Sequence, residues 1–331
     1  MFKLKYLKYK KKYLNLKNNL KGGVSNVNVD LNFAINTEDN INEIKPLINI
    51  NNINKKDIIG NTPLLNSIKQ YNFEVTKLLL EKGADVDIPD NDNITPLMHI
   101  IKKMKIENIS AFDNFVSKVK NINAIDNFGR SSLMYALMHN KHYIIEKLID
   151  LGAKINIVDN NDNTMLLYAI KFNFQNPEIF IPFSFVPSGE KKIYHYIDFK
   201  NKEGVTPLIY AIVRNNLNLI QKLLFYYKAD PTNSDDEGRT PLLYAIKFNN
   251  INAIDELLKF NEVKENINTR NIDGKTYLIH AIESNNNNNN IIIKLLEYRA
   301  DPYIPDINGK SPISYALENN NNLFLQNFNT R

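Results

Sequence analysis

A repeat of roughly 33–36 residues recurs along this chain, and this periodicity constrains the fold more than any other feature. Each copy places Thr or Ser, and most often Pro after it, directly before an apolar run, as in DDEGRTPLLYAIKFNN at 235–250. Repeats this short cannot bury their apolar faces alone, so an ordered series of them predicts a stacked array. The positions equivalent to Pro241 are Pro63, Pro96, Ser132, Met165, Pro207, Pro241, Tyr277 and Pro312.

The start of each repeat carries the signals for a turn followed by a capped helix. The hydroxyl of Thr240 or its equivalent can accept from the N–H groups of the first helical turn. Proline fits the first helical position, because its missing N–H would have no partner there. Glycine three residues earlier, such as Gly238, permits the preceding turn. A second apolar segment with a leucine pair follows, such as Leu257–Leu258, so the sequence predicts two short helices in each repeat.

This pattern resembles the ankyrin repeat, whose signature is Gly-x-Thr-Pro-Leu-His-x-Ala, then a Leu-Leu helix, then Gly-Ala-Asp. The resemblance covers roughly Asp57 to Asn319. It implies an all-α fold, a solenoid of about eight helix-turn-helix units with short β-hairpin turns. One departure is systematic, because the family's histidine is replaced by residues such as Leu65, Met98 and Ser314. Its hydrogen bonds must therefore be missing or replaced.

The position after that replaced histidine is aromatic or histidine in seven repeats. At helical spacing, and followed by alanine in most copies, these residues are interpreted as a packing stripe rather than a binding site. They are His99, Tyr135, Tyr168, Tyr210, Tyr244, His280 and Tyr315.

The N-terminal segment differs from the rest in charge and period. Residues 1–29 carry eight lysines and no acid, whereas the remaining residues sum to −3, from 33 basic and 36 acidic side chains. Residues 1–23 predict a basic amphipathic helix, which resembles the Lys- and Tyr-rich leader of proteins from Mimivirus-like giant DNA viruses. The leader could contact an anionic membrane or nucleic acid, address the protein to the virion, or be a solvated helix without a fixed partner. Gly22-Gly23 could be a protease site.

Several segments depart from the regular repeat. Residues 24–56 are expected to form an N-terminal cap or a degenerate repeat, with one amphipathic helix over 41–50, and residues 320–331 a closing segment after the array at 57–319. Prolines in the long repeat at 171–200 should break its second helix, leaving either core-filling aromatics or a protruding aromatic loop. The run Asn285–Asn290 is expected to be a bulging or disordered turn. The abundance of asparagine is interpreted as the imprint of an AT-rich genome.

The residues that usually carry chemistry are sparse. Without cysteine, a disulfide framework, a zinc–thiolate site and a cysteine nucleophile are excluded. No nucleophile elbow, phosphate loop or His-Glu-x-x-His motif occurs. His139 and His142 could form part of a metal site, but no third ligand is nearby. We therefore expect no enzymatic activity, no cofactor and no metal. Acids that recur at one turn position are interpreted as turn formers: Asp90, Asp126, Asp159, Asp235 and Asp306.

In ankyrin proteins the concave face, built from first helices and turns, binds partners, so the resemblance implies a protein–protein interaction scaffold. Carried onto this chain, that face holds ten basic residues against two acids, Glu283 and Glu318, which would suit a partner with an acidic surface. The turn tips reverse this balance, with Asp92, Glu203, Asp236, Glu237 and Asp273 against Lys202. The ten basic residues are Lys69, Lys102, Lys103, Arg130, Lys171, Arg214, Arg239, Lys247, Lys275 and Lys310.

Other functional hypotheses stay open. One is a virion or membrane-associated structural protein that acts through residues 1–23. Another is a ubiquitin-ligase adaptor, although no F-box-like segment follows the last repeat. The net-acidic repeat body is not expected to bind nucleic acid, so membrane or nucleic-acid contact would involve only residues 1–23. We expect a monomer in a reducing intracellular compartment, either host cytoplasm or virion. No run of 18 apolar residues occurs, so no membrane span is expected.

Overall fold

The computed structural model describes residues 30–37, 40–103, 109–181, 197–284, 289–319 and 324. The predicted leader helix at 1–23, with Gly22-Gly23, and most of the closing segment at 320–331 lie outside these ranges. The chain divides into two compact units, Met1–Lys154 and Ile155–Arg331, which are called unit 1 and unit 2 below.

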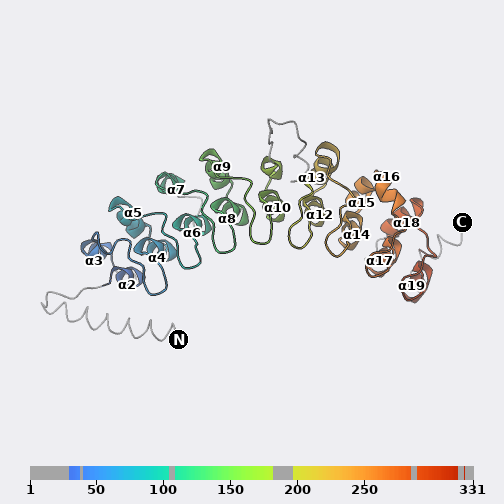
Figure 1. Ribbon diagram of the computed structural model, residues 1–331, viewed down its shortest axis with the longest axis horizontal. Helices are drawn as coiled ribbons and strands as arrows, with labels where there is room; N and C mark the ends of the chain where they lie inside the picture. Colours follow the sequence, from blue (N-terminus) through green and yellow to red (C-terminus); the bar gives the residue numbers. More distant parts are fainter. Residues whose placement is uncertain are drawn as a thin grey trace. The chain divides into compact units, whose positions relative to one another are not determined.

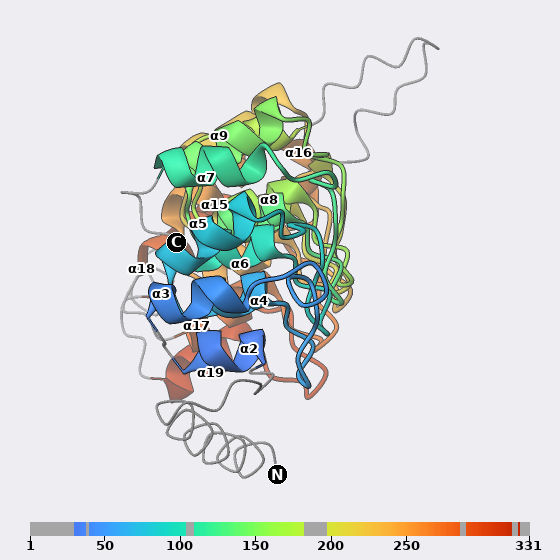
Figure 2. The same ribbon diagram turned by 90° about the vertical axis from the view of Figure 1, so that its left-hand side faces the viewer.

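Unit 1 is built from pairs of antiparallel helices. The first helices α4, α6 and α8 pack side by side, and α5, α7 and α9 form a second row (Figure 1). The turns that precede the first helices lie along one edge of the unit (Figure 2). Its helices are α2 (Leu31–Asn36), α3 (Ile41–Ile44), η1 (Lys45–Leu47), α4 (Pro63–Lys69), α5 (Phe73–Glu81), α6 (Pro96–Lys103), α7 (Ile109–Val116), α8 (Ser132–Met138) and α9 (His142–Asp150).

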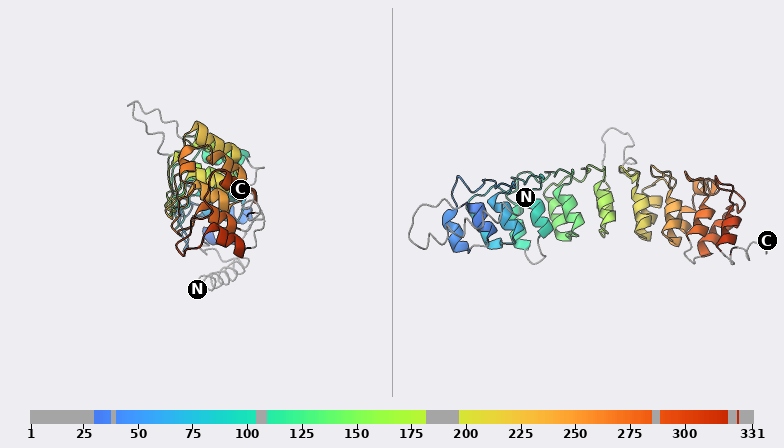
Figure 3. Two further views of the ribbon diagram at one scale, coloured as in Figure 1. Left: turned by 90° about the vertical axis from the view of Figure 1, so that its right-hand side faces the viewer. Right: turned by 90° about the horizontal axis from the view of Figure 1, so that it is seen from below.

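Unit 2 repeats this arrangement. Its first helices α10, α12, α14, α17 and α19 form one row, each packed against the next, and the turns again follow one edge (Figure 3). Its helices are α10 (Met165–Lys171), η3 (Pro177–Phe180), α12 (Pro207–Val213), α13 (Leu217–Gln221), η4 (Lys222–Tyr226), α14 (Pro241–Lys247), α15 (Ile251–Leu257), α16 (Asn261–Glu265), α17 (Tyr277–Glu283), α18 (Asn289–Glu297) and α19 (Pro312–Glu318).

The predicted helix starts are confirmed in all eight repeats. The Thr or Ser hydroxyl before each first helix accepts a hydrogen bond from the amide three residues later, at 3.2–3.4 Å. These bonds satisfy one of the amides that a helix leaves without a partner in its first turn. The repeated Thr/Ser position therefore sets where each first helix begins.

The ends of the first helices show that asparagine has a structural role, which its interpretation as genome composition missed. Asn140, Asn173, Asn215 and Asn249, one residue beyond the C-cap, have φ between 51° and 57°. Asparagine tolerates this left-handed region better than most residues other than glycine. One residue after two of them, Asn216 and Asn250 cap the second helix with their side chains. Asparagine therefore both ends one helix and starts the next.

The turns between repeats differ from the expected β-hairpins. Within the described ranges there is no strand, and the one bridge joins Ile125 to Ser131. Each turn is closed by the amide of an Asp or Asn, which donates to the carbonyl four residues later at 2.8–3.2 Å. The side chain of that Asp or Asn accepts from the amides two and four residues later, as Asp235 does from Glu237 and Arg239. Because these amides are already bonded within the turn, no strand ladder extends from it.

The irregular segments are partly explained by proline. The single helix predicted over 41–50 is wrong: α3 ends at Ile44 and a 3₁₀ turn follows, because Pro46 lacks an N–H. Where other repeats begin their second helix, the long repeat has a 3₁₀ turn at Pro177–Phe180, in agreement with the predicted break at its prolines. Phe174 and Phe180 there are buried, and residues 182–196 lie outside the described ranges. Of the asparagine run, Asn289 and Asn290 begin α18 instead of lying in a turn.

Candidate functional site

In five repeats, a hydrogen bond links the aspartate of the turn to the helix that follows it. A carboxylate oxygen of the turn aspartate accepts from the side chain nine residues later on the first helix. The hydrogen bonds of the family's missing histidine are thus replaced, and the stripe read as packing also has this polar role. The bonds are Asp90–His99 at 2.9 Å, Asp126–Tyr135 at 2.9 Å, Asp159–Tyr168 at 2.8 Å, Asp235–Tyr244 at 2.7 Å and Asp306–Tyr315 at 2.7 Å.

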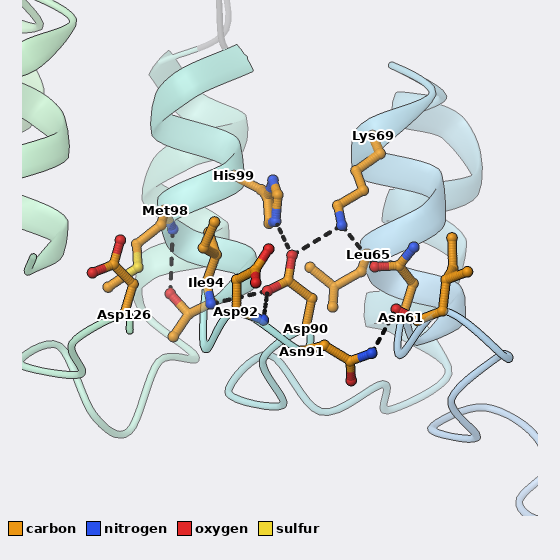
Figure 4. A network of polar contacts seen from close by, with 12 residues as sticks. Asn61, Leu65, Lys69, Asp90, Asn91, Asp92, Ile94, Met98, His99 and Asp126 are labelled. Atoms are coloured by element: carbon orange, nitrogen blue, oxygen red, sulfur yellow. Dashed lines mark hydrogen bonds and ion pairs between the residues drawn. The ribbon is translucent and has the colours of Figure 1, made fainter. Parts of the chain in front are cut away.

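In unit 1, one of these carboxylates also joins two neighbouring repeats (Figure 4). Asp90 Oδ2 lies 2.9 Å from His99 Nε2 on α6 and 3.0 Å from Lys69 Nζ at the end of α4. Lys69 Nζ also donates to Asn61 Oδ1 at 2.6 Å. The lysine, which the sequence assigned to partner binding, therefore holds the turn of the next repeat against its own helix.

The pKa values in these clusters reflect burial opposed by hydrogen bonding. Burial alone would raise the pKa of the Asp126 carboxyl, but hydrogen bonds from Arg130 and Tyr135 outweigh it and lower that pKa. Burial, then the hydrogen bond to Asp235, raises the pKa of Tyr244 to about 12. Burial also lowers the pKa of His99, although its hydrogen bond to Asp90 opposes this. Asp126 thus favours its ionised form, whereas Tyr244 and His99 on the helices favour their neutral forms.

The lowered pKa of His99 predicts that stability falls on mild acidification. An unfolded histidine titrates near 6.5, so the unfolded state takes up a proton before buried His99 does as the pH falls through that value. Replacing His99 with Tyr, the residue that other repeats use, should keep the bond to Asp90 and reduce this loss. The measurement is the melting temperature of both proteins from about pH 7.5 to pH 5. If the melting temperature of the variant fell as steeply with pH as that of the wild type, the pKa of His99 would not differ between the folded and unfolded states. The pKa values of His139 and His280 are also lowered, so some decline is expected in the variant as well.

Half of the ten predicted basic residues are engaged by acids of their own repeat or the next. Lys69 bonds to Asp90 as described above, and the two acids predicted on this surface, Glu283 and Glu318, are both ion-paired. An engaged cation contributes little net field to an incoming partner. The other pairs are Arg130–Asp126 at 2.7 Å, Arg239–Asp235 and Arg239–Glu237 at 2.6 Å each, Lys275–Glu283 at 2.6 Å, and Lys310–Glu318.

The remaining five basic residues fall into two groups, one on each unit. Lys102 and Lys103 end α6 of unit 1, and Lys103 Nζ lies 4.3 Å from the ring centroid of Tyr71. Lys171, Arg214 and Lys247 lie exposed at the ends of α10, α12 and α14 in unit 2. Within the described ranges, no carboxylate lies at ion-pair distance from those three.

Two phenylalanines beside these cations were not predicted as part of the surface, because the charge pattern does not mark them. Phe172 and Phe248 directly follow Lys171 and Lys247, and Phe248 is 53% exposed. The signal was present in the sequence, since Tyr-Ala-Ile-Lys-Phe-Asn occurs both at 168–173 and at 244–249. The acidic tip residues predicted from the sequence are all exposed, as is Lys202.

The described residues offer little for metal binding or for a membrane span. His139 lies at the C-cap of α8 and His142 begins α9. The described ranges contain no group of three or more potential metal-binding side chains. None of the helices in this part of the chain has the length and apolar character needed to cross a bilayer.

Comparison with known proteins agrees with this repeat architecture. The profile of the family described as "Ankyrin repeats (3 copies)" matches residues 31–110, 104–181 and 187–271. An ankyrin repeat protein of Acanthamoeba polyphaga mimivirus is 27% identical over 190 residues, which are 57% of this chain and 23% of that protein. One of Fowlpox virus is 28% identical over 119 residues, covering 36% of this chain and 17% of that protein.

A third relative is an enzyme by name. The NAD-dependent deacetylase sir2B of Dictyostelium discoideum is 27% identical over 183 residues, which are 54% of this chain and 18% of that protein. This chain thus matches less than a quarter of the length of each of these three relatives. The capped helix pairs, the recurrent turns and the profile that matches most of the sequence together show that the chain belongs to the ankyrin repeat family.

Proposed function

We propose that this chain is a non-enzymatic scaffold that binds a partner protein through the exposed side of its first helices and the adjoining turns. Ankyrin repeats generally mediate binding to protein partners, and the family is generally without enzymatic activity. In unit 2, the proposal is best supported by the surface that is formed by the exposed residues of α10, α12, α14, α17 and α19 and by the residue that follows each of these helices. This surface is called the first-helix face below.

The observation that carries the proposal is the exposure of apolar and cationic side chains on one row of helices. Phe248, which directly follows α14, is 53% exposed, and Lys247 beside it has no carboxylate at ion-pair distance among the described residues. Exposed aromatic and cationic side chains that lie together are typical of protein interfaces. Lys171 at the end of α10 and Arg214 directly after α12 extend this surface over three repeats.

The test is site-specific photo-crosslinking from two exposed aromatic positions of unit 2. A photoreactive phenylalanine analogue replaces Phe248 on the first-helix face or, as control, Tyr226 in η4, which is 72% exposed. Both positions are at helix ends and both are aromatic, so the substitution is similar in size. In an Acanthamoeba lysate, we expect a discrete crosslinked protein from position 248 and not from position 226.

A further inference from the structure

Among the described residues of the first-helix face of unit 2, the cations without an ion-paired acid lie on three successive repeats. Lys171, Arg214 and Lys247 lie at the ends of neighbouring first helices, and Arg214 also donates to the carbonyl of Lys171. In the next two repeats, Lys275 and Lys310 are ion-paired to Glu283 and Glu318. The uncompensated positive charge of this face is therefore concentrated on α10, α12 and α14.

The rings of Phe172 and Phe248 lie beside these cations, and each ring is held in place by a tyrosine of the preceding helix. Phe172 stacks on Tyr168 with ring centroids 5.8 Å apart, and Phe248 stacks on Tyr244 at 6.3 Å with a 13° angle between planes. Each tyrosine is fixed by its hydrogen bond to the turn aspartate. The rings thus form a prepared apolar surface that loses little side-chain entropy when a ligand binds. We call Lys171, Phe172, Arg214, Lys247 and Phe248 the basic–aromatic stripe.

The spacing of the stripe determines which ligand fits it. Packed helices lie roughly 8–10 Å apart, and an extended chain rises about 3.3 Å per residue. Three residues of an extended peptide therefore span one repeat. In polyproline II geometry there are about three residues per turn, so every third side chain also points to the same side. Carboxylates at every third position would meet Lys171, Arg214 and Lys247 in turn.

We propose that the basic–aromatic stripe binds an extended acidic peptide segment of the partner protein, with a carboxylate at every third position and apolar side chains between them. The inference rests on the proposed function and names the chemistry of its partner. The carboxylates pair with the three cations, and Arg214 can accept a bidentate pair. The apolar side chains cover the rings of Phe172 and Phe248.

A single-stranded nucleic acid also carries negative charge and bases that can stack on aromatic rings. The acidic residues of the turns, however, disfavour its binding to this surface. The exposed acids Glu203, Asp236 and Asp273 lie on the turns beside the first helices. Burial and then the charge of Glu203 raise the pKa of Tyr210 on α12, so that carboxylate acts on the same face. A phosphate at every nucleotide would meet these acids, whereas a peptide can place neutral residues opposite them.

The experiment measures fluorescence anisotropy of labelled synthetic ligands with the full chain. The peptide has glutamate at every third position with leucine and proline between, and its control has the same composition with the glutamates adjacent. An oligothymidylate of equal charge represents nucleic acid. The variant Lys171→Glu/Arg214→Glu/Lys247→Glu is compared with Lys82→Glu/Lys118→Glu/Lys228→Glu, which reverses three exposed lysines at the ends of second helices. Circular dichroism melts establish that both triple variants are folded.

We expect the spaced peptide to bind wild type at least about tenfold more tightly than its control, and the stripe variant to lose at least about tenfold in affinity. The second-helix variant should bind like wild type. Phe172→Ala/Phe248→Ala should weaken binding at both low and high salt, because apolar contacts are not screened. The proposal is overturned if neither peptide binds, if both triple variants weaken equally, or if oligothymidylate binds more tightly. A protein crosslinked from position 248 despite such a result would leave the proposed function standing and reject only this partner chemistry.

Discussion

Replacing Gly204 with Ala should destabilise unit 2 by roughly 2–5 kcal/mol, the sum of a backbone and a steric term. Gly204 has φ +73°, in the left-handed region, where a residue with a Cβ costs about 1–2 kcal/mol. The added Cβ would also lie 2.2 Å from the backbone nitrogen of Asp236 in the next turn. Such an overlap with backbone forces the two turns apart, at a cost typical of overpacked cores, about 1–3 kcal/mol.

Gly238 is a matched control for this substitution. It occupies the same position of the next repeat with φ +72°, yet a Cβ there would meet nothing within 4 Å. Gly238→Ala should therefore show only the backbone cost of about 1–2 kcal/mol. Urea unfolding followed by circular dichroism compares the two variants. Equal losses would mean that the turns of neighbouring repeats are not in close contact at Gly204.

Replacing Asp126 with Ala should cost about 3–5 kcal/mol, as the loss of one partner from a buried charged pair does. Asp126 is 4% exposed, and its side chain accepts from the amides of Phe128 and Arg130. It also accepts from the Tyr135 hydroxyl at 2.9 Å and pairs with the Arg130 guanidinium at 2.7 Å. Removing it leaves Tyr135, itself 4% exposed, with a buried hydroxyl that has lost its acceptor.

Two further variants separate the parts of this effect. Tyr135→Phe removes two hydrogen bonds, the one that the hydroxyl donates to Asp126 and the one that it accepts from Arg130 at 3.1 Å, and should cost about 1.5–3 kcal/mol. Asp92→Ala removes an exposed turn acid of the preceding repeat and should change stability by less than about 0.5 kcal/mol. The free energy of unfolding of each variant is measured by chemical denaturation, followed by circular dichroism and by tyrosine fluorescence. The chain has no tryptophan that would mask the tyrosine signal. A loss at Asp126 no greater than that at Asp92 would contradict the role of the aspartate–tyrosine bond.

The parts of the fold that could be predicted are those that depend only on residues close together in the sequence. Thr240 and its equivalents cap helices wherever they occur, and Gly238 takes the positive φ that its turn requires. Neither property depends on a distant residue. The helix break at Pro46 was also local, yet it was missed because an apolar periodicity over 41–50 was given more weight than the missing N–H.

The parts that could not be predicted depend on contacts across repeats. Lys69 and Lys171 occupy equivalent helix positions, but Lys69 reaches a carboxylate in the next turn whereas Lys171 has the non-ionisable Asn201 in the equivalent place. Counting charges by position therefore overstated the basic surface. The contacts of Phe248, by contrast, lie within one repeat, where its ring stacks on Tyr244 and the Tyr244 hydroxyl donates to Asp235.

The central claim, that a partner protein binds the first-helix face, is tested most directly by the ratio of photo-crosslinking yields at positions 248 and 226. Mass spectrometry identifies the crosslinked protein and the peptide within it. The account predicts one dominant protein from position 248, lost when Lys171, Arg214 and Lys247 are reversed in charge, and no specific product from position 226. Equal yields at both positions, or a specific product from position 226 alone, would contradict it.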